Sequence, residues 1–67
     1  MNKEMLRAVM IMNGDTYEDL AKVLKITKQS VCAKINENGT EFKQGEIALI
    51  RDRYNLSPEK VTAIFFN

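Results

Sequence analysis

The sequence predicts an all-α fold, a compact five-helix bundle that forms a single domain over residues 1–67. Apolar residues recur three and four positions apart in five successive segments, which is the spacing of helices with one buried face. Helix start signals stand at Thr16, at Thr27 and at Ser57-Pro58. The connections between the segments are short enough for neighbouring helices to pack together. A chain of 67 residues suffices for one domain and is too short for two.

The first helix is expected from Lys3 to about Asn13, with Gly14 placed to end it. Its inward stripe consists of Leu6, Val9 and Met10. Three further apolar residues, Met5, Ile11 and Met12, do not belong to this stripe. Either the helix is half enclosed by its neighbours, or these residues form an apolar patch for a partner.

Residues 16–36 read TYEDLAKVLKITKQSVCAKIN and predict two short helices joined by a tight bend. Thr16 and Asp19 have capping-box spacing, and Leu20, Ala21 and Leu24 follow at helical spacing. Lys25 and Ile26 form the bend, Thr27 caps the second helix, and Val31 and Ile35 point back at the first. The small side chain of Ala21 would allow the helices to cross closely. This is the pattern of a helix-turn-helix.

The remainder of the chain predicts a polar loop and two more helices. Gly39 is the expected flexible point of the loop at 36–42, and Phe42 its anchor in the core. A fourth helix is expected at about 43–54, closed by Asn55 in a left-handed conformation, and a fifth begins at Ser57-Pro58-Glu59. The expected core residues of these helices are Ile47, Ile50, Tyr54, Val61, Ile64 and Phe65.

Composition argues against several functional classes. The chain has no histidine and one cysteine, so it lacks the usual general base and the ligands of a zinc site. It also lacks a glycine-rich phosphate loop, an apolar run long enough for a membrane span and a signal-peptide pattern. We therefore expect a cytoplasmic protein that is not an enzyme and has no cofactor, metal, membrane partner or small-molecule substrate.

The residues of this motif resemble those of a known family. Leu20-Ala21, Leu24, Ile26, Thr27 and Val31 match the pattern of Cro-like and lambda-repressor-like helix-turn-helix regulators of phages and prophages. Residues 34–66 are similar to the second half of the small regulators in that family. The chain departs from the family at two positions, where Lys25 stands in place of the usual bend glycine and Tyr17 in place of a glutamine that contacts DNA. The resemblance implies transcription regulation by binding a double-stranded DNA operator.

Candidate base contacts lie on the outer face of the second motif helix, the expected recognition helix at 27–36. Gln29 can pair with adenine, Lys28 with guanine, and Ala33 can contact a thymine methyl group. Cys32 shares this face, where a small and weakly polar side chain is a simpler interpretation than a redox centre. The alternative for the whole face is an ordinary solvated helix surface.

Phosphate contacts are implied by the resemblance at the start of each motif helix and in the following loop. The matching residues are Tyr17, Thr27, Ser30, Asn38 and Lys43. Four lysines (Lys22, Lys25, Lys28 and Lys34) against two acidic residues make residues 16–36 locally basic, although the whole chain has a net charge of only +1.

The predicted partners leave two alternatives open. Phe65 and Phe66 end the fifth helix, and one of them could cap the core while the other contacts a second subunit in a weak homodimer. The low net charge and the surplus methionines instead suit a protein-interaction module on the same fold, such as an antirepressor.

Overall fold

A computed structural model describes residues 1–66, and Asn67, the last residue of the predicted domain, lies outside the described residues. Over the described range the chain forms five helices and no strand, which confirms the predicted all-α class. The helices are α1 (Lys3–Met12), α2 (Tyr17–Leu24), α3 (Lys28–Ile35), α4 (Gln44–Tyr54) and α5 (Pro58–Phe65). None of these helices is both long enough and apolar enough to cross a bilayer.

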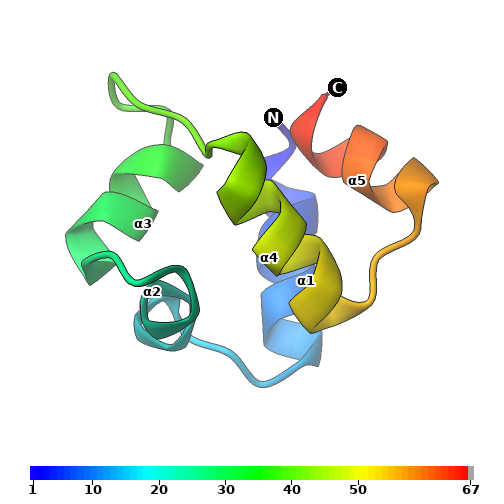
Figure 1. The fold of residues 1–67 in the computed structure, drawn as a ribbon, viewed down its shortest axis with the longest axis horizontal. Coiled ribbons are helices and arrows are strands. Elements are labelled where there is room, and N and C mark those ends of the chain that lie inside the picture. The colour runs from blue at the N-terminus through cyan, green and yellow to red at the C-terminus, as the bar shows by residue number, and fades with distance from the viewer. Residues whose placement is uncertain (67) are drawn as a thin grey trace.

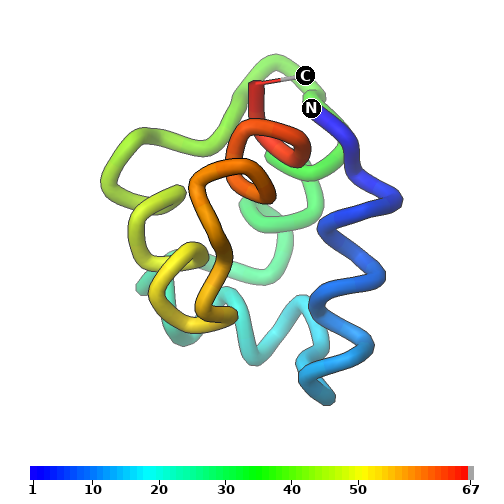
Figure 2. The backbone as a smooth tube through the Cα atoms, turned by 90° about the vertical axis from the view of Figure 1, so that its right-hand side faces the viewer, coloured from blue at the N-terminus to red at the C-terminus, as the bar shows by residue number. Residues whose placement is uncertain are grey.

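The helices pack into a globule whose longest dimension runs from α3 to α5. In Figure 1, α3 and α5 lie at opposite ends of the molecule, with α1 and α4 between them and α2 below α3. Figure 2 shows the beginning of α1 beside the end of α5. The backbone N–H of Asn2 donates to the carbonyl of Ile64 at 2.6 Å, so the first and last helices are joined directly.

One hydrophobic core takes residues from every helix. Its buried members are Leu6, Val9, Met10, Leu20, Ala21, Leu24, Val31, Ile35, Phe42, Ile50, Tyr54 and Ile64. Phe42 anchors the α3–α4 loop as predicted, with its ring edge-on to that of Phe65 at a centroid distance of 5.9 Å. Val61, predicted to face the core, is only half-buried.

Four helices end on a residue in the left-handed conformation: Gly14, Lys25, Glu37 and Asn55. The following residue then reaches back to a carbonyl five positions earlier, as in the bond from Leu56 N–H to the Arg51 carbonyl at 2.9 Å. This arrangement satisfies carbonyls that the helix leaves unpaired. The left-handed position of Glu37 was not expected, because glutamate has little preference for it.

Candidate nucleic-acid interface

Helix α2 begins with a complete capping box. Thr16 Oγ1 accepts from the Asp19 backbone N–H at 3.2 Å, and the Asp19 carboxylate accepts from the Thr16 N–H at 2.9 Å. These hydrogen bonds from Thr16, the backbone one above all, lower the pKa of Asp19. The predicted cap is therefore present, and it fixes where α2 starts.

The turn between α2 and α3 is made without glycine. Lys25 has φ 58° and ψ 41°, the left-handed conformation that glycine adopts most readily. The N–H of Ile26 donates to the carbonyl of Ala21 at 3.0 Å and closes the end of α2. Ala21 is buried, so a small side chain stands where α2 lies against its neighbours. The chain can thus reverse direction within a few residues.

Helix α3 is held by its inner face. Thr27 caps it by accepting from the Ser30 N–H at 3.1 Å. Val31, Lys34 and Ile35 are its buried residues. Because residues at positions i, i+3 and i+4 share one side of a helix, the other side of α3 is left for polar groups. In Figure 1, α3 forms one edge of the molecule, with no helix on its outer side.

None of the four predicted base-contacting residues of α3 is among its buried residues. Lys28 and Gln29, in the first turn, are exposed, and Cys32 and Ala33 are half-buried. The Asn36 side-chain amide donates to the Cys32 carbonyl at 3.0 Å and lies 3.7 Å from its sulfur. Helix α3 contains no acidic residue, so the helix itself brings no like charge against a phosphate.

The five predicted phosphate-contacting residues lie at three places around α3: the start of α2, the start of α3 and the α3–α4 loop. Tyr17 is half-buried, and its hydroxyl accepts from Arg7 Nε at 2.7 Å. Thr27 and Ser30 bond to each other through their hydroxyls at 3.0 Å. Asn38 and Lys43 are exposed. Each of these side chains can still reach solvent.

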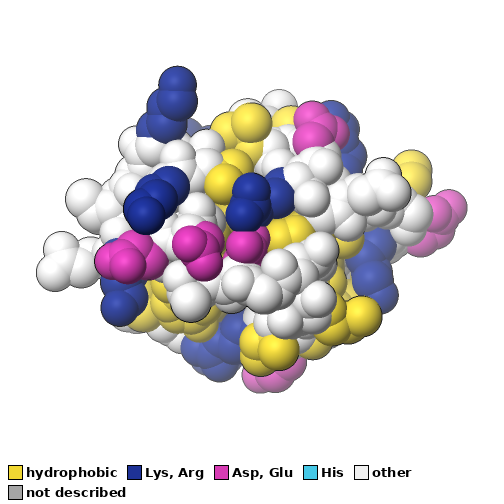
Figure 3. All heavy atoms as spheres, turned by 90° about the horizontal axis from the view of Figure 1, so that it is seen from below, with side chains coloured by type: hydrophobic (Ala, Val, Ile, Leu, Met, Phe, Trp, Pro, Cys, Tyr) yellow, Lys and Arg dark blue, Asp and Glu magenta, His cyan; other side chains and the backbone are white. Residues whose placement is uncertain are grey.

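Lys34 is the exception to the predicted basic surface. Its side chain is buried, and its ammonium lies 2.9 Å from Glu46 Oε1 and 3.4 Å from the Glu41 carbonyl. The charged end of Lys34 is therefore covered, and it does not add to an exposed basic surface. Lys22, Lys25 and Lys28 remain exposed. Figure 3 shows acidic and basic side chains mixed on the face seen from the side of α2.

Glu46 accepts hydrogen bonds from two donors at the start of α4. Its carboxylate accepts from Lys34 and also from the backbone N–H of Lys43 at 2.9 Å. Burial favours its neutral form, but the hydrogen bonds from Lys43 and Lys34 outweigh burial and lower the pKa of Glu46. Sequence reasoning missed this pair because its members are on different helices. The pair fixes the α3–α4 loop, which carries Asn38 and Lys43.

A second ion pair joins the start of α2 to the end of α4. Asp15, 7% exposed in its side chain, accepts from Arg53 Nη2 at 2.8 Å and from the Tyr54 hydroxyl at 2.7 Å. The hydrogen bond from Arg53 is the main cause that lowers the pKa of Asp15 to about 2. Burial, followed by the bond to Asp15, raises the pKa of Tyr54. The sequence analysis did not foresee these contacts of Asp15 with Arg53 and Tyr54.

Comparison of the chain with protein-family models, with curated proteins and with solved structures found no match. Within residues 1–66 no three His, Cys, Asp or Glu side chains are grouped so that they could hold a metal ion.

Proposed function

We propose that this protein is a sequence-specific DNA-binding regulator of the Cro-like and lambda-repressor-like helix-turn-helix type, with α3 in the major groove of double-stranded DNA. The observation that carries the proposal is that α3 is held by buried side chains while its N-terminal end stays exposed. Val31 and Ile35 anchor the helix, while Lys28 and Gln29 stand exposed at its N-terminal end. A recognition helix places that end against the base edges.

The two sets of candidate contacts have different tasks in this mechanism. Lys28, Gln29, Cys32 and Ala33 meet base edges and supply specificity. The hydroxyls of Tyr17, Thr27 and Ser30, with Asn38 and Lys43, meet phosphates and fix the register. Occupying the operator would then block polymerase or a competing phage or prophage regulator.

Selection of bound sites from a random duplex pool tests this proposal directly. Recovery of a common site supports it, and Gln29→Ala should then cost about 1–3 kcal/mol and relax the preference at one base pair. Equal weakening on every sequence would remove Gln29 from the base-reading set. A pool with no common site, together with no binding at low salt, would contradict the proposal as a whole.

A weak two-fold dimer on the operator is part of the same proposal. Phe66 is 65% exposed at the end of α5, whereas Phe65 packs against Phe42. The division predicted for these two residues, one in the core and one at a subunit contact, is consistent with that placement. A palindromic selected site would support the dimer, and its half-site spacing would give the distance between the two α3 helices.

The second candidate function is a protein-interaction module with little DNA affinity, such as an antirepressor. The observation that favours it is charge. With Lys34 paired to Glu46, the exposed lysines of residues 16–36 are opposed by Glu18 and Asp19, and the face in Figure 3 is mixed in sign. A salt titration on random duplex separates the two functions, because a DNA binder loses affinity steeply as salt rises.

A further inference from the structure

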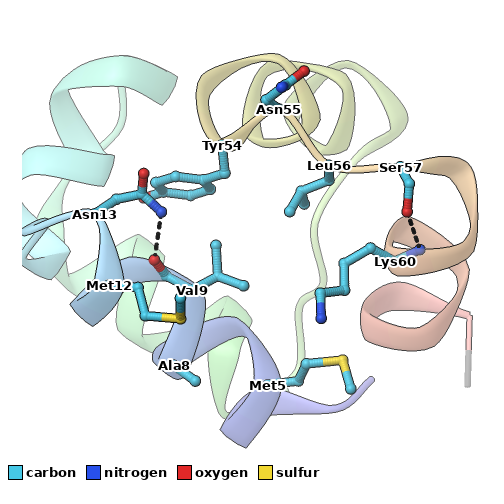
Figure 4. A pocket seen from close by; sticks show the side chains of 10 residues that line it. All are labelled: Met5, Ala8, Val9, Met12, Asn13, Tyr54, Asn55, Leu56, Ser57 and Lys60. Carbon is cyan, nitrogen blue, oxygen red and sulfur yellow. Dashed lines mark hydrogen bonds between the residues drawn. The ribbon is translucent and has the colours of Figure 1, made fainter.

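A groove of about 410 Å³ lies between α1 and the connection from α4 to α5. Figure 4 shows it open between the two segments, with apolar side chains from both of them. We define the α1/α5 groove by six of its lining residues: Met5, Val9, Met12, Tyr54, Leu56 and Lys60. Helix α3 lies at the other end of the molecule (Figure 1), so the groove is separate from the candidate nucleic-acid interface.

The rim of the groove is apolar and adaptable. Met12 is 85% exposed, and Met5 is half-buried against the core. Methionine side chains are unbranched and flexible, so they can repack around an apolar side chain that enters between them. Exposed methionine at a hollow is therefore suited to receiving an apolar surface from another molecule.

Most of the polar side chains that line the groove already form hydrogen bonds within the chain. The Asn13 amide donates to the Val9 carbonyl at 2.8 Å, Ser57 Oγ accepts from the Lys60 N–H at 3.1 Å, and the Tyr54 hydroxyl donates to Asp15. An extended peptide would find few partners here for its own backbone groups. A helix satisfies its backbone internally and presents only side chains, so it matches this lining better.

Lys60 determines the charge of the occupant. Among residues 1–66 it is the one charged residue that lines the groove, and Figure 4 shows its side chain extending into the opening toward Met5. Within residues 1–66 it takes part in no salt bridge. A carboxylate beside the apolar stripe of the occupant would complement this ammonium.

We propose that the α1/α5 groove docks an amphipathic helix of a partner protein, one whose apolar stripe is flanked by a carboxylate that pairs with Lys60. This docking does not depend on the proposed DNA binding, because the two surfaces share no residue. A molecule with both surfaces would bring the partner to the site occupied by α3.

Titration of the isotope-labelled protein with helical peptides, followed by nuclear magnetic resonance, tests the docking. The probe is a short alanine and glutamine helix with leucines at i, i+4 and i+7 and one glutamate beside them, and the matched probe carries lysine in place of glutamate. We expect saturable shifts at Met5, Met12, Leu56 and Lys60. The glutamate peptide should bind about two- to fivefold more tightly, as an exposed ion pair allows, and Lys60→Glu should reverse that order.

Two neighbouring residues of α1 supply a matched pair of variants. Met12 lines the groove, whereas Ile11, 75% exposed, does not. Met12→Ser should weaken the glutamate peptide about fivefold or more through lost apolar contact, and Ile11→Ser should leave its affinity unchanged. Neither side chain belongs to the core, so both variants keep the fold.

Several results would overturn the docking proposal. Equal affinity for the two peptides would show that Lys60 does not pair with the glutamate. Equal weakening of binding by the two serine variants would show that the peptide does not bind in the groove. A proline-containing peptide of the same composition that binds as well would exclude a helix as the occupant. Shifts at the groove on concentrating the protein alone would assign it to a second copy of this chain, and shifts with octanoate but with neither peptide would assign it to a small apolar anion.

Discussion

Lys34 Nζ lies 2.9 Å from Glu46 Oε1, which joins the buried face of α3 to the first turn of α4. Both side chains are largely covered, at 9% and 13% exposure. A carboxylate and an ammonium removed from water in this way depend on each other, since either one left alone would be a buried and uncompensated charge.

Glu46→Gln should therefore lower the free energy of unfolding by about 1–3 kcal/mol. Glutamine can still accept from the Lys43 N–H, so the loss reports mainly on the unpaired Lys34. Urea denaturation measures it, with the exposed Glu41→Gln as the control. Adding Lys34→Met to Glu46→Gln should recover part of the stability, because the double variant buries no charge. A Glu46→Gln protein as stable as the parent would show that the pair contributes nothing.

Lys43→Ala should weaken binding to all DNA sequences alike. Loss of one phosphate contact reduces the slope of log affinity against log salt by about 0.9. Lys60→Ala removes the same charge at the α5 end of the molecule and should leave the slope unchanged. The measurement is a fluorescence anisotropy titration on random duplex at several salt concentrations. If the two variants had the same slope, Lys43 would not be a phosphate contact.

Asp15 should contribute stability that is lost in acid. Its pKa is about 2 in the folded protein against a usual value of 3.8. Because the folded pKa is the lower one, the contribution is complete above about pH 4 and disappears as the pH falls toward 2. Asp15→Asn should cost about 1–2 kcal/mol at pH 7, since the pair with Arg53 is partly open to solvent.

The same variant should flatten the stability profile between pH 4 and 2, as measured by urea denaturation at each pH. Asp19, Glu37 and Glu46 also have lowered pKa values, so some acid sensitivity should remain. A full parental slope in Asp15→Asn would contradict the role given to the Asp15–Arg53 pair.

Lys25→Gly should stabilise the protein by about 0.5–1 kcal/mol. Lysine at φ 58° is in a conformation that costs a side chain with a Cβ about 1–2 kcal/mol, and the greater freedom of glycine in the unfolded chain cancels part of the gain. Lys22→Gly, which removes the same charge three residues earlier within α2, should instead destabilise by about 1 kcal/mol. Thermal and urea unfolding of both variants measures whether their changes in stability have opposite signs.

Local sequence patterns determined the helices and most of their ends. Thr16, Thr27 and Ser57 cap helices because their side chains reach a backbone N–H a few residues away, and this requires no other part of the fold. Helical spacing likewise separated the buried Val31 and Ile35 from the exposed Gln29. The candidate base contacts could be proposed from local sequence because they lie on a single helix.

Tertiary structure decided the contacts between residues far apart in the chain. Asp15 meets Arg53 and Tyr54, and Lys34 meets Glu46, only because α4 lies beside the start of α2 and the inner side of α3. The α1/α5 groove likewise depends on how α1 and the α4–α5 connection are spaced. Helical periodicity shows which face of a helix is apolar, but it does not show which other helix that face packs against. Ion pairs and grooves between helices therefore follow only from the packing.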